Sequence, residues 1–226
     1  MTRTTLGNLA SHAYAEIKRQ IFDFILMPND KIFEAELAQR IQVSRTPLRQ
    51  ALQRLEHEGF VKALPKIGWL VAPLDFDKLD ELYDFRILLE CYAVAQMCKQ
   101  INERTALAEL EKIWCVSKRK RVTDGMKVGE LDEQFHRQLV QALGNELITK
   151  THTEITEKIR IVRRLDFTKT PRIEATYDEH AKILEAIAHR RVAEAQRLLT
   201  AHIQQSKIEV RKITLDMLQQ ARAQAA

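Results

Sequence analysis

The sequence predicts a mainly α-helical protein of two domains, in which three helices and a β-hairpin precede an all-α antiparallel helical bundle. Hydrophobic residues make up 45% of the 226 residues, with only six glycines and five prolines, as in helix-rich proteins. The chain is long enough for two domains. Strand-like alternation is confined to one short region, and the remainder repeats at helical spacing. We expect domains at 1–73 and 74–226, joined at Pro73–Asp75.

The first domain opens with two predicted helices. Apolar residues at helical spacing run from Leu9 to Met27, and Pro28 ends this helix because the residue before a proline leaves the helical region. A short helix from Glu34 to Ile41 follows. The third predicted helix starts with Ser44 as its N-cap and runs to about Glu58, with Gly59 as its C-terminal cap.

The third helix separates leucines from arginines. Leu48, Leu52 and Leu55 repeat at helical spacing, whereas Arg45 and Arg49 lie one turn apart at its N-terminal end. A helix of this kind suits the major groove of DNA. Taken alone, the stretch also fits an ordinary amphipathic helix with solvated arginines.

A β-hairpin is predicted directly after this helix. Its strands are Phe60–Leu64 and Trp69–Ala72, and the connection between them carries Lys66 and Gly68. Such a wing places a lysine or a backbone segment against phosphates or the minor groove. Helix, short turn, helix and hairpin together predict a winged helix-turn-helix domain.

Charge and composition agree with a nucleic-acid-binding protein of the cytoplasm. The formal net charge is +5, and residues 1–73 hold ten Lys and Arg against seven Asp and Glu. No apolar run approaches the roughly 18 residues that cross a membrane. The three cysteines form no C-x-x-C pair, so we expect reduced thiols, as in cytosolic proteins.

Six helices are predicted for the second domain, with short breaks between them. They span about Phe76–Ile101, Glu103–Arg121, Thr123–Leu143, Glu146–Leu165, Pro171–His189 and Val192–Ala221.

Four residues of this bundle are candidate metal ligands. Asp132 and His136 share a helix face because they lie four residues apart, and His180 and His202 fall on the last two helices. Three imidazoles and a carboxylate suit Zn, Ni, Fe or Mn and leave positions open for a ligand carboxylate. Each histidine also fits a hydrogen-bonded core position, and His152 is interpreted as an ordinary surface or packing residue.

Two arginines are candidate anion-binding groups. Arg86 lies in a strongly apolar helix, where it could pair with Glu90 one turn on or clamp an anionic ligand through its planar fork. Among Arg160, Arg163 and Arg164, helical phase favours Arg163 as a second positive group. A solvated basic face also accounts for that run.

These motifs together resemble the GntR family of bacterial transcription regulators, in the FadR-like group with an FCD-type helical domain. In the first domain the resemblance rests on Glu36–Ala38, Val43–Leu52, Leu55, Glu58–Gly59 and Gly68. In the second domain it rests on Arg86 with Leu89–Glu90, and on Asp132, His136, Glu179–His180 and His202, which match the family's Asp-plus-three-His metal set in order.

The resemblance implies a dimer and a small organic acid bound over a metal ion, for which Zn is favoured among Zn, Ni, Mn and Fe. It also shows departures. Gln42 replaces a usual Gly, Gln50 replaces a usual Glu, and Ala35 replaces an arginine that reads bases in some members. These departures bear on the operator sequence more than on DNA binding itself.

We therefore expect a ligand-responsive repressor or activator that binds double-stranded DNA. Two winged domains, related by a two-fold axis, would occupy a palindromic operator. Arg45 and Arg49 would read guanines or anchor on phosphates. Ser44 and Thr46 would lie at the helix N-terminus that binds a phosphate. The effector's carboxylate would bind the metal, Arg86 and Arg163. The alternatives are a regulator with a purely structural metal and a metal-dependent hydrolase. No evident general base or nucleophile accompanies the candidate site, so we expect no enzymatic activity.

Overall fold

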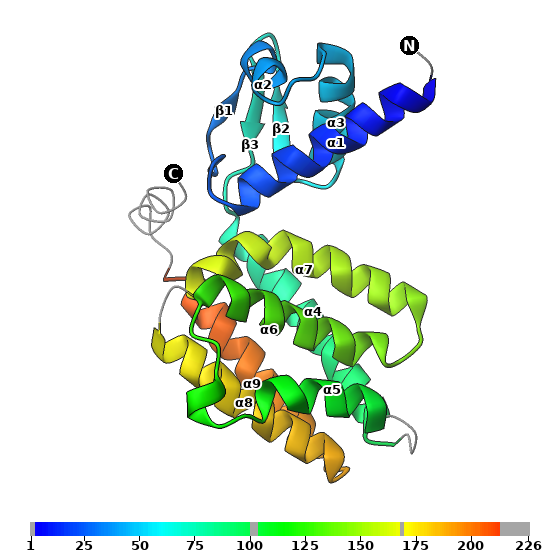
Figure 1. Ribbon diagram of the computed structural model, residues 1–226, viewed down its shortest axis with the longest axis vertical. Helices are drawn as coiled ribbons and strands as arrows, with labels where there is room; N and C mark the ends of the chain where they lie inside the picture. The colour runs from blue at the N-terminus through cyan, green and yellow to red at the C-terminus, as the bar shows by residue number, and fades with distance from the viewer. Residues whose placement is uncertain (1–2, 100–103, 168–169, 213–226) are drawn as a thin grey trace. The chain divides into compact units, whose positions relative to one another are not determined.

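The computed structural model describes residues 3–99, 104–167 and 170–212. These residues divide into two compact units, one that ends at Asp75 and one that begins at Phe76 (Figure 1). The predicted fold class is confirmed, because a small sheet with three helices precedes a unit built of helices.

The first unit combines three helices with a three-stranded antiparallel sheet of order β1-β3-β2. Its elements are α1 (Arg3–Phe22), β1 (Lys31–Ile32), α2 (Glu34–Arg40), α3 (Arg45–His57), β2 (Val61–Leu64) and β3 (Gly68–Val71). The hairpin pairs Leu64 with Gly68 and Val61 with Val71. Leu48, Leu52 and Leu55 are fully buried on α3, which packs against α1, so the apolar side of α3 faces the core as its spacing predicted.

The end of α1 differs from the prediction. The helix stops at Phe22, five residues before the predicted end at Met27. Phe24 adopts a left-handed φ of 59°, and the backbone N–H of Ile25 and that of Leu26 both donate to the carbonyl of Gln20. The chain therefore turns back and buries Phe24, Leu26 and Met27 beside the helix instead of extending it.

The strand β1 was not predicted. It has two residues, Lys31 and Ile32, which pair with Leu70 and Trp69 of β3. A strand of this length shows no alternation, so only its pairing partner defines it. It nevertheless constrains the wing, because a Cβ on Gly68 would lie 2.6 Å from the backbone oxygen of Ile32.

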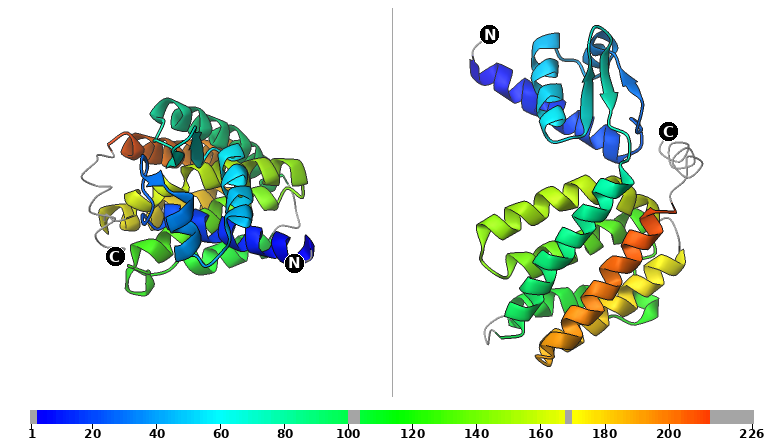
Figure 2. Two further views of the ribbon diagram at one scale, coloured as in Figure 1. Left: turned by 90° about the horizontal axis from the view of Figure 1, so that it is seen from above. Right: turned by 180° about the vertical axis from the view of Figure 1, so that it is seen from behind.

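The second unit is a bundle of helices around a common core. Its elements are α4 (Phe76–Met97), α5 (Arg104–Trp114), a 3-10 turn at Lys118–Lys120, α6 (Gly125–Gln141), α7 (Glu146–Asp166), α8 (Thr170–Ala188) and α9 (Val192–Val210). Figure 2 shows α4 and α9 side by side, and α9 also packs against α7 and α8. The helices α4, α7, α8 and α9 thus pack directly against one another in pairs that all include α9 or α4.

Two helices of this unit end several residues before their predicted bounds, and the first of them, predicted for Phe76–Ile101, ends at Met97. The helix predicted for Glu103–Arg121 ends at Trp114, whose buried ring fixes this end of α5. The basic residues at 118–121 offer no apolar face to bury and form only a short 3-10 turn. The last helix is described as far as Val210, and the predicted continuation to Ala221 lies outside the described residues.

Two sequence-level expectations can be compared with the described residues. None of their helices is both long and apolar enough to cross a membrane. The three cysteines are free, with Cys98 buried, Cys91 half-buried and Cys115 exposed.

The turn between α2 and α3 generates a stability prediction. Gln42 has a φ of 57°, a left-handed conformation that costs a residue with a Cβ about 1–2 kcal/mol. We expect Gln42→Gly to raise the free energy of unfolding by about 0.5–1 kcal/mol after the entropy of glycine is deducted. Urea titration followed by circular dichroism measures this change. As a matched control, Gln39→Gly on the exposed face of α2 should lower the free energy of unfolding by about 1 kcal/mol. Equal losses in both variants would contradict the prediction.

Candidate functional site

A groove of about 500 Å³ in the first unit contains most of the predicted DNA-contacting residues. It lies between the start of α3, the start of α2 and the wing. Arg45, Arg49, Lys66 and Gly68 all line it, together with the exposed apolar side chains of Phe33 and Ile67. The fold therefore brings together cations that lie about 20 residues apart in the sequence.

Arg49 is held in this groove by a residue that the sequence analysis did not identify. Glu34 accepts a 2.7 Å hydrogen bond from Nε of Arg49 and a 3.1 Å hydrogen bond from Nε1 of Trp69. Burial alone would raise the pKa of Glu34, but these two hydrogen bonds and the Arg49 charge lower it overall, so Glu34 is ionised at neutral pH. Glu34 thus joins α2, α3 and β3 behind the exposed guanidinium.

The N-terminus of α3 is exposed and lacks a side-chain cap. Ser44 occupies the N-cap position with extended backbone angles, as predicted, but its side chain makes no capping hydrogen bond. Thr46 is exposed in the first turn, and Pro47 is buried. The N–H groups at this end are therefore not used by the Ser44 side chain.

The wing tip is a tight turn. Ile67 donates from its backbone N–H to the carbonyl of Leu64 at 3.0 Å, and Lys66 has a φ of 65°. Lys66 is exposed, whereas Gly68 is required by its φ of 140° and by the closeness of Ile32. The structure thus gives Gly68 a packing role beside the predicted one.

In the second unit, the four predicted metal ligands converge in the core. Asp132 and His136 come from α6, His180 from α8 and His202 from α9, and one ligand atom of each lies within 4.8 Å of the others. Oδ1 of Asp132 lies 3.6, 3.3 and 3.7 Å from Nε2 of His136, His180 and His202. Nε2 of His202 lies 3.1 Å from that of His136 and 3.3 Å from that of His180. Ligand atoms about 2.1 Å from one ion, at tetrahedral or octahedral angles, lie roughly 3.0–3.4 Å apart. The separations of 3.1–3.3 Å match this spacing, and those of 3.6 and 3.7 Å exceed it by a few tenths of an ångström, so the cluster is close to the spacing of a shared cation.

Two further carboxylates fix which nitrogen of His136 and of His202 faces the cluster. Nδ1 of His136 lies 2.5 Å from Oε2 of Glu90, and Nδ1 of His202 lies 2.6 Å from Oε2 of Glu179. A neutral imidazole that donates from Nδ1 carries a lone pair on Nε2. Two lone pairs and a carboxylate oxygen therefore face one point, an arrangement that repels itself unless a cation lies there.

Burial keeps these imidazoles neutral. Desolvation, followed by the charge of Arg86, lowers the pKa of His136 to about 4. Desolvation and the neighbouring histidines hold the pKa values of His180 and His202 well below their ordinary range. Oδ1 of Asp132 has no hydrogen-bond partner among the described residues. An orphaned buried oxygen beside three neutral imidazoles is a donor set that suits a divalent metal.

The ring of His180 is fixed by aromatic side chains rather than by a carboxylate. It stacks on Phe135, with ring centroids 3.7 Å apart and planes inclined by 9°, and it meets Trp114 edge-on at 4.2 Å. Its Nδ1 is buried without a hydrogen-bond partner in the described part of the chain. Packing therefore orients this third imidazole.

Glu90 is the buried centre of the surrounding network, a role that was not predicted from its four-residue spacing to Arg86. It accepts from Nε of Arg86 at 2.6 Å, from His136 and from Nε2 of His152 at 2.9 Å. Burial would raise the pKa of Glu90, but the charge of Arg86 and the two histidines hold it well below its usual range. His152, interpreted from the sequence as an ordinary surface or packing residue, is 1% exposed and hydrogen-bonded to Glu90, so it is a buried polar residue and not a surface one. Its partner lies 62 residues away in the sequence, so no local pattern reveals it.

The two predicted effector-binding arginines lie close to the cluster. Arg163 is buried and forms an ion pair with Oδ2 of Asp132, so it is not part of a solvated basic face. Arg86 is 1% exposed and pairs with Glu90, while its Nη2 has no hydrogen-bond partner in the described residues. Arg163 thus contacts the cluster directly, at Asp132. Arg86 is connected to the cluster through Glu90, which also binds His136.

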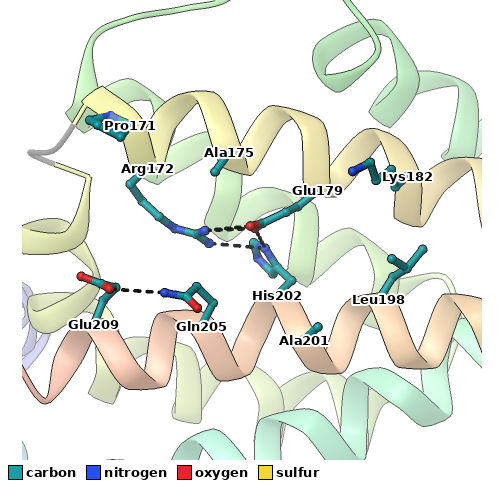
Figure 3. A pocket seen from close by; sticks show the side chains of 10 residues that line it. All are labelled: Pro171, Arg172, Ala175, Glu179, Lys182, Leu198, Ala201, His202, Gln205 and Glu209. Atoms are coloured by element: carbon teal, nitrogen blue, oxygen red, sulfur yellow. Dashed lines mark hydrogen bonds and ion pairs between the residues drawn. The ribbon is translucent and has the colours of Figure 1, made fainter.

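An open groove of about 570 Å³ reaches one residue of the cluster, His202, from outside. It runs between α8 and α9, and His202 forms part of its wall (Figure 3). Arg172 and Glu179 on α8 lie beside His202 on α9, and the dashed lines in Figure 3 join all three side chains.

Comparisons with known proteins agree with this architecture. Residues 9–71 match the model described as "Bacterial regulatory proteins, gntR family", and residues 81–205 match the FCD domain. The Nta operon transcriptional regulator of Aminobacter aminovorans is 34% identical over 177 residues, which are 78% of this chain and 82% of that protein. The uncharacterized HTH-type transcriptional regulator YdhC of Bacillus subtilis (strain 168) is 29% identical over 191 residues, 84% of this chain and 85% of that protein.

Solved structures share the fold. The Rhodococcus sp. RHA1 protein designated GntR has a TM-score of 0.74 at 20% identity, covering 91% of this chain and 98% of its own. Escherichia coli McbR/YncC has a TM-score of 0.67 at 17% identity, covering 90% of this chain and 97% of its own.

These families consist of transcriptional regulators, not enzymes. The chain therefore belongs to the GntR family of bacterial regulators and is a DNA-binding transcriptional regulator with an FCD domain.

Proposed function

We propose that a small organic acid controls operator binding by this regulator, and that the acid binds at a divalent metal held by Asp132, His136, His180 and His202. The observation that carries the proposal is the buried convergence of Oδ1 of Asp132 with three imidazole Nε2 atoms. The donor set suits Zn, which we favour, and also Ni, Mn or Fe. A bound ion supplies positive charge to which the carboxylate of an acid binds.

The protein's own cations complete the proposed effector site. Arg163 already contacts a carboxylate oxygen of Asp132, and Arg86 presents an unused Nη2 in a buried setting. A buried guanidinium nitrogen without an acceptor is costly, and an effector carboxylate would satisfy it. The two arginines are therefore the groups that we assign to effector binding.

On the DNA side, we propose that a homodimer places two copies of α3 in neighbouring major grooves of a palindromic operator. Arg45 and Arg49 read base edges or bind phosphates from the groove they line. Ser44, Thr46 and the uncapped start of α3 bind a phosphate, and Lys66 with Gly68 presents the wing.

A purely structural metal is the second candidate. The four ligands join α6, α8 and α9, and all are nearly fully buried, as in closed structural sites. The open groove beside His202 favours the sensing site, because a structural site has no need of access from solvent.

The metal proposal predicts a difference in metal content. We expect purified wild-type protein to hold about one divalent ion per chain, and His136→Ala and His180→Ala to lose most of it because each removes a ligand. Elemental analysis after dialysis measures this. His189→Ala is the matched control, because His189 is exposed and should leave the content unchanged. Equal metal content in all four proteins would exclude the site.

The DNA proposal predicts two kinds of loss. Duplexes selected by the wild type from a random-sequence pool serve as the specific probe, and scrambled duplexes as the non-specific probe. Arg49→Ala should cost about 1–3 kcal/mol on the selected duplexes and little on the scrambled ones, because base contacts carry specificity. Lys66→Ala should weaken both and lower the salt slope by about one, as loss of a phosphate contact does. Binding titrations at several salt concentrations distinguish these outcomes, and an unchanged Arg49→Ala profile would contradict the assignment.

Sensing and structural roles predict different thermal shifts. If the ion is part of an effector site, some members of a panel of small carboxylic acids should raise the melting temperature of the metal-loaded protein, because a ligand that binds only the folded state stabilises it. The same acids should have a smaller effect after chelation. A panel with no shift, combined with a large shift from the metal alone, would favour the structural role.

A further inference from the structure

The groove between α8 and α9 contains a buried cation beside a metal-ligand candidate. Arg172 is only 8% exposed, and Lys182 and Gln205 also line the groove. Pro171, Ala175, Leu198 and Ala201 provide its apolar walls. Its volume of about 570 Å³ lies within the range of about 300–1,000 Å³ that small-molecule pockets occupy.

The guanidinium of Arg172 already holds a carboxylate, and that carboxylate belongs to the protein. Its Nη1 donates to Oε1 and Oε2 of Glu179 at 3.2 and 3.0 Å. Oε2 of Glu179 also accepts from Nδ1 of His202 at 2.6 Å. Because Nδ1 donates its proton to Glu179, the 3.4 Å approach of Nη2 of Arg172 to Nδ1 is a contact rather than a hydrogen bond. The carboxylate of Glu179 therefore binds both Arg172 in the groove and Nδ1 of His202, the ring nitrogen that faces away from the candidate metal cluster.

Glu179 differs from the other carboxylate that orients a histidine of the cluster. The side chain of Glu90 is fully buried, whereas that of Glu179 is 31% exposed. Glu179 also lines an open groove (Figure 3). Exposure allows the Glu179 carboxylate to reach solvent when it leaves Arg172, and the buried charge of Arg172 then requires another carboxylate in its place. The two histidines are therefore oriented by carboxylates of very different exposure.

We propose that the α8–α9 groove is a carboxylate-binding site whose internal occupant is Glu179, and that an organic acid with an apolar body displaces Glu179 from Arg172. The acid's carboxylate pairs with Arg172, and its body lies against Leu198, Ala201 and Ala175. The proposal rests on the proposed function, because it gives the effector a position next to the metal ligand His202. It assigns Arg172 to effector recognition and makes Glu179 a positioning residue.

Displacement of Glu179 connects groove occupancy to the metal site. When Glu179 leaves Arg172, Nδ1 of His202 exchanges its acceptor for the acid's carboxylate or for water. Outer partners of metal-bound histidines typically change metal affinity by about 10- to 100-fold. The acid and the metal therefore affect each other's binding, and by linkage the effect is mutual.

The test removes the internal carboxylate and supplies a free one. Glu179→Ala should weaken Zn²⁺ binding about 10- to 100-fold in competition titrations with a chromophoric chelator. Acetate should restore most of this affinity, because it fits the vacated position between Arg172 and His202. Acetate should not restore it in Glu179→Ala combined with Arg172→Met, and should not raise the affinity of the wild type. Glu179→Gln retains an acceptor for His202 and should bind Zn²⁺ nearly as tightly as the wild type.

Each result decides between the proposals. Unchanged Zn²⁺ affinity in Glu179→Ala would show that Glu179 does not orient His202, and a loss that acetate leaves unrepaired in a folded variant would show that the groove admits no carboxylate to Arg172. Either result overturns the inference while the metal site of the wild type stands. If the wild type itself binds no metal, the proposed function fails. The groove is then tested by whether acetate raises the melting temperature of Glu179→Ala but not of the double variant.

Discussion

The second unit depends on the pairing of one buried charge. Glu90 is completely removed from solvent, and a carboxylate in that position is costly unless cations and N–H donors surround it. The chain supplies them from three helices: Arg86 on α4, His136 on α6 and His152 on α7. Satisfying this charge fixes the rotation of those helices about their axes. The Nε2 atom of His136 is aimed at Asp132 as a result, so the candidate metal site is built outward from Glu90.

The features that the sequence revealed are those with local periodicity or spacing. The leucine repeat of α3 predicted its buried side, and the four-residue spacing of Asp132 and His136 predicted a shared helix face. Residues whose roles depend on distant partners were missed. Glu34 meets Arg49 and Trp69 across 15 and 35 residues, and Glu179 meets His202 across 23. A two-residue strand and the left-handed turn at Phe24 are likewise set by packing, which no local pattern encodes.

Both units hold a side chain in a defined direction, a cationic one in the first unit and candidate metal ligands in the second. In each, a carboxylate behind the functional group accepts from a nitrogen that does not face the ligand: Nε in Arg49 and Nδ1 in His136 and His202. The nitrogens that face outward remain available to DNA bases or to an ion. In each of these side chains one nitrogen binds the supporting carboxylate and another remains for the ligand. The carboxylates Glu34, Glu90 and Glu179 are therefore part of the candidate sites.

Trp69 and Trp114 are the chain's only two tryptophans. Trp69 donates to the carboxylate that holds Arg49, and Trp114 lies edge-on against the ring of His180. Each unit therefore contains one tryptophan in contact with its own candidate site. Replacing either indole with phenylalanine would leave a protein whose emission reports on a single unit, so DNA binding and ligand binding can be followed separately in the same full-length chain without an attached dye.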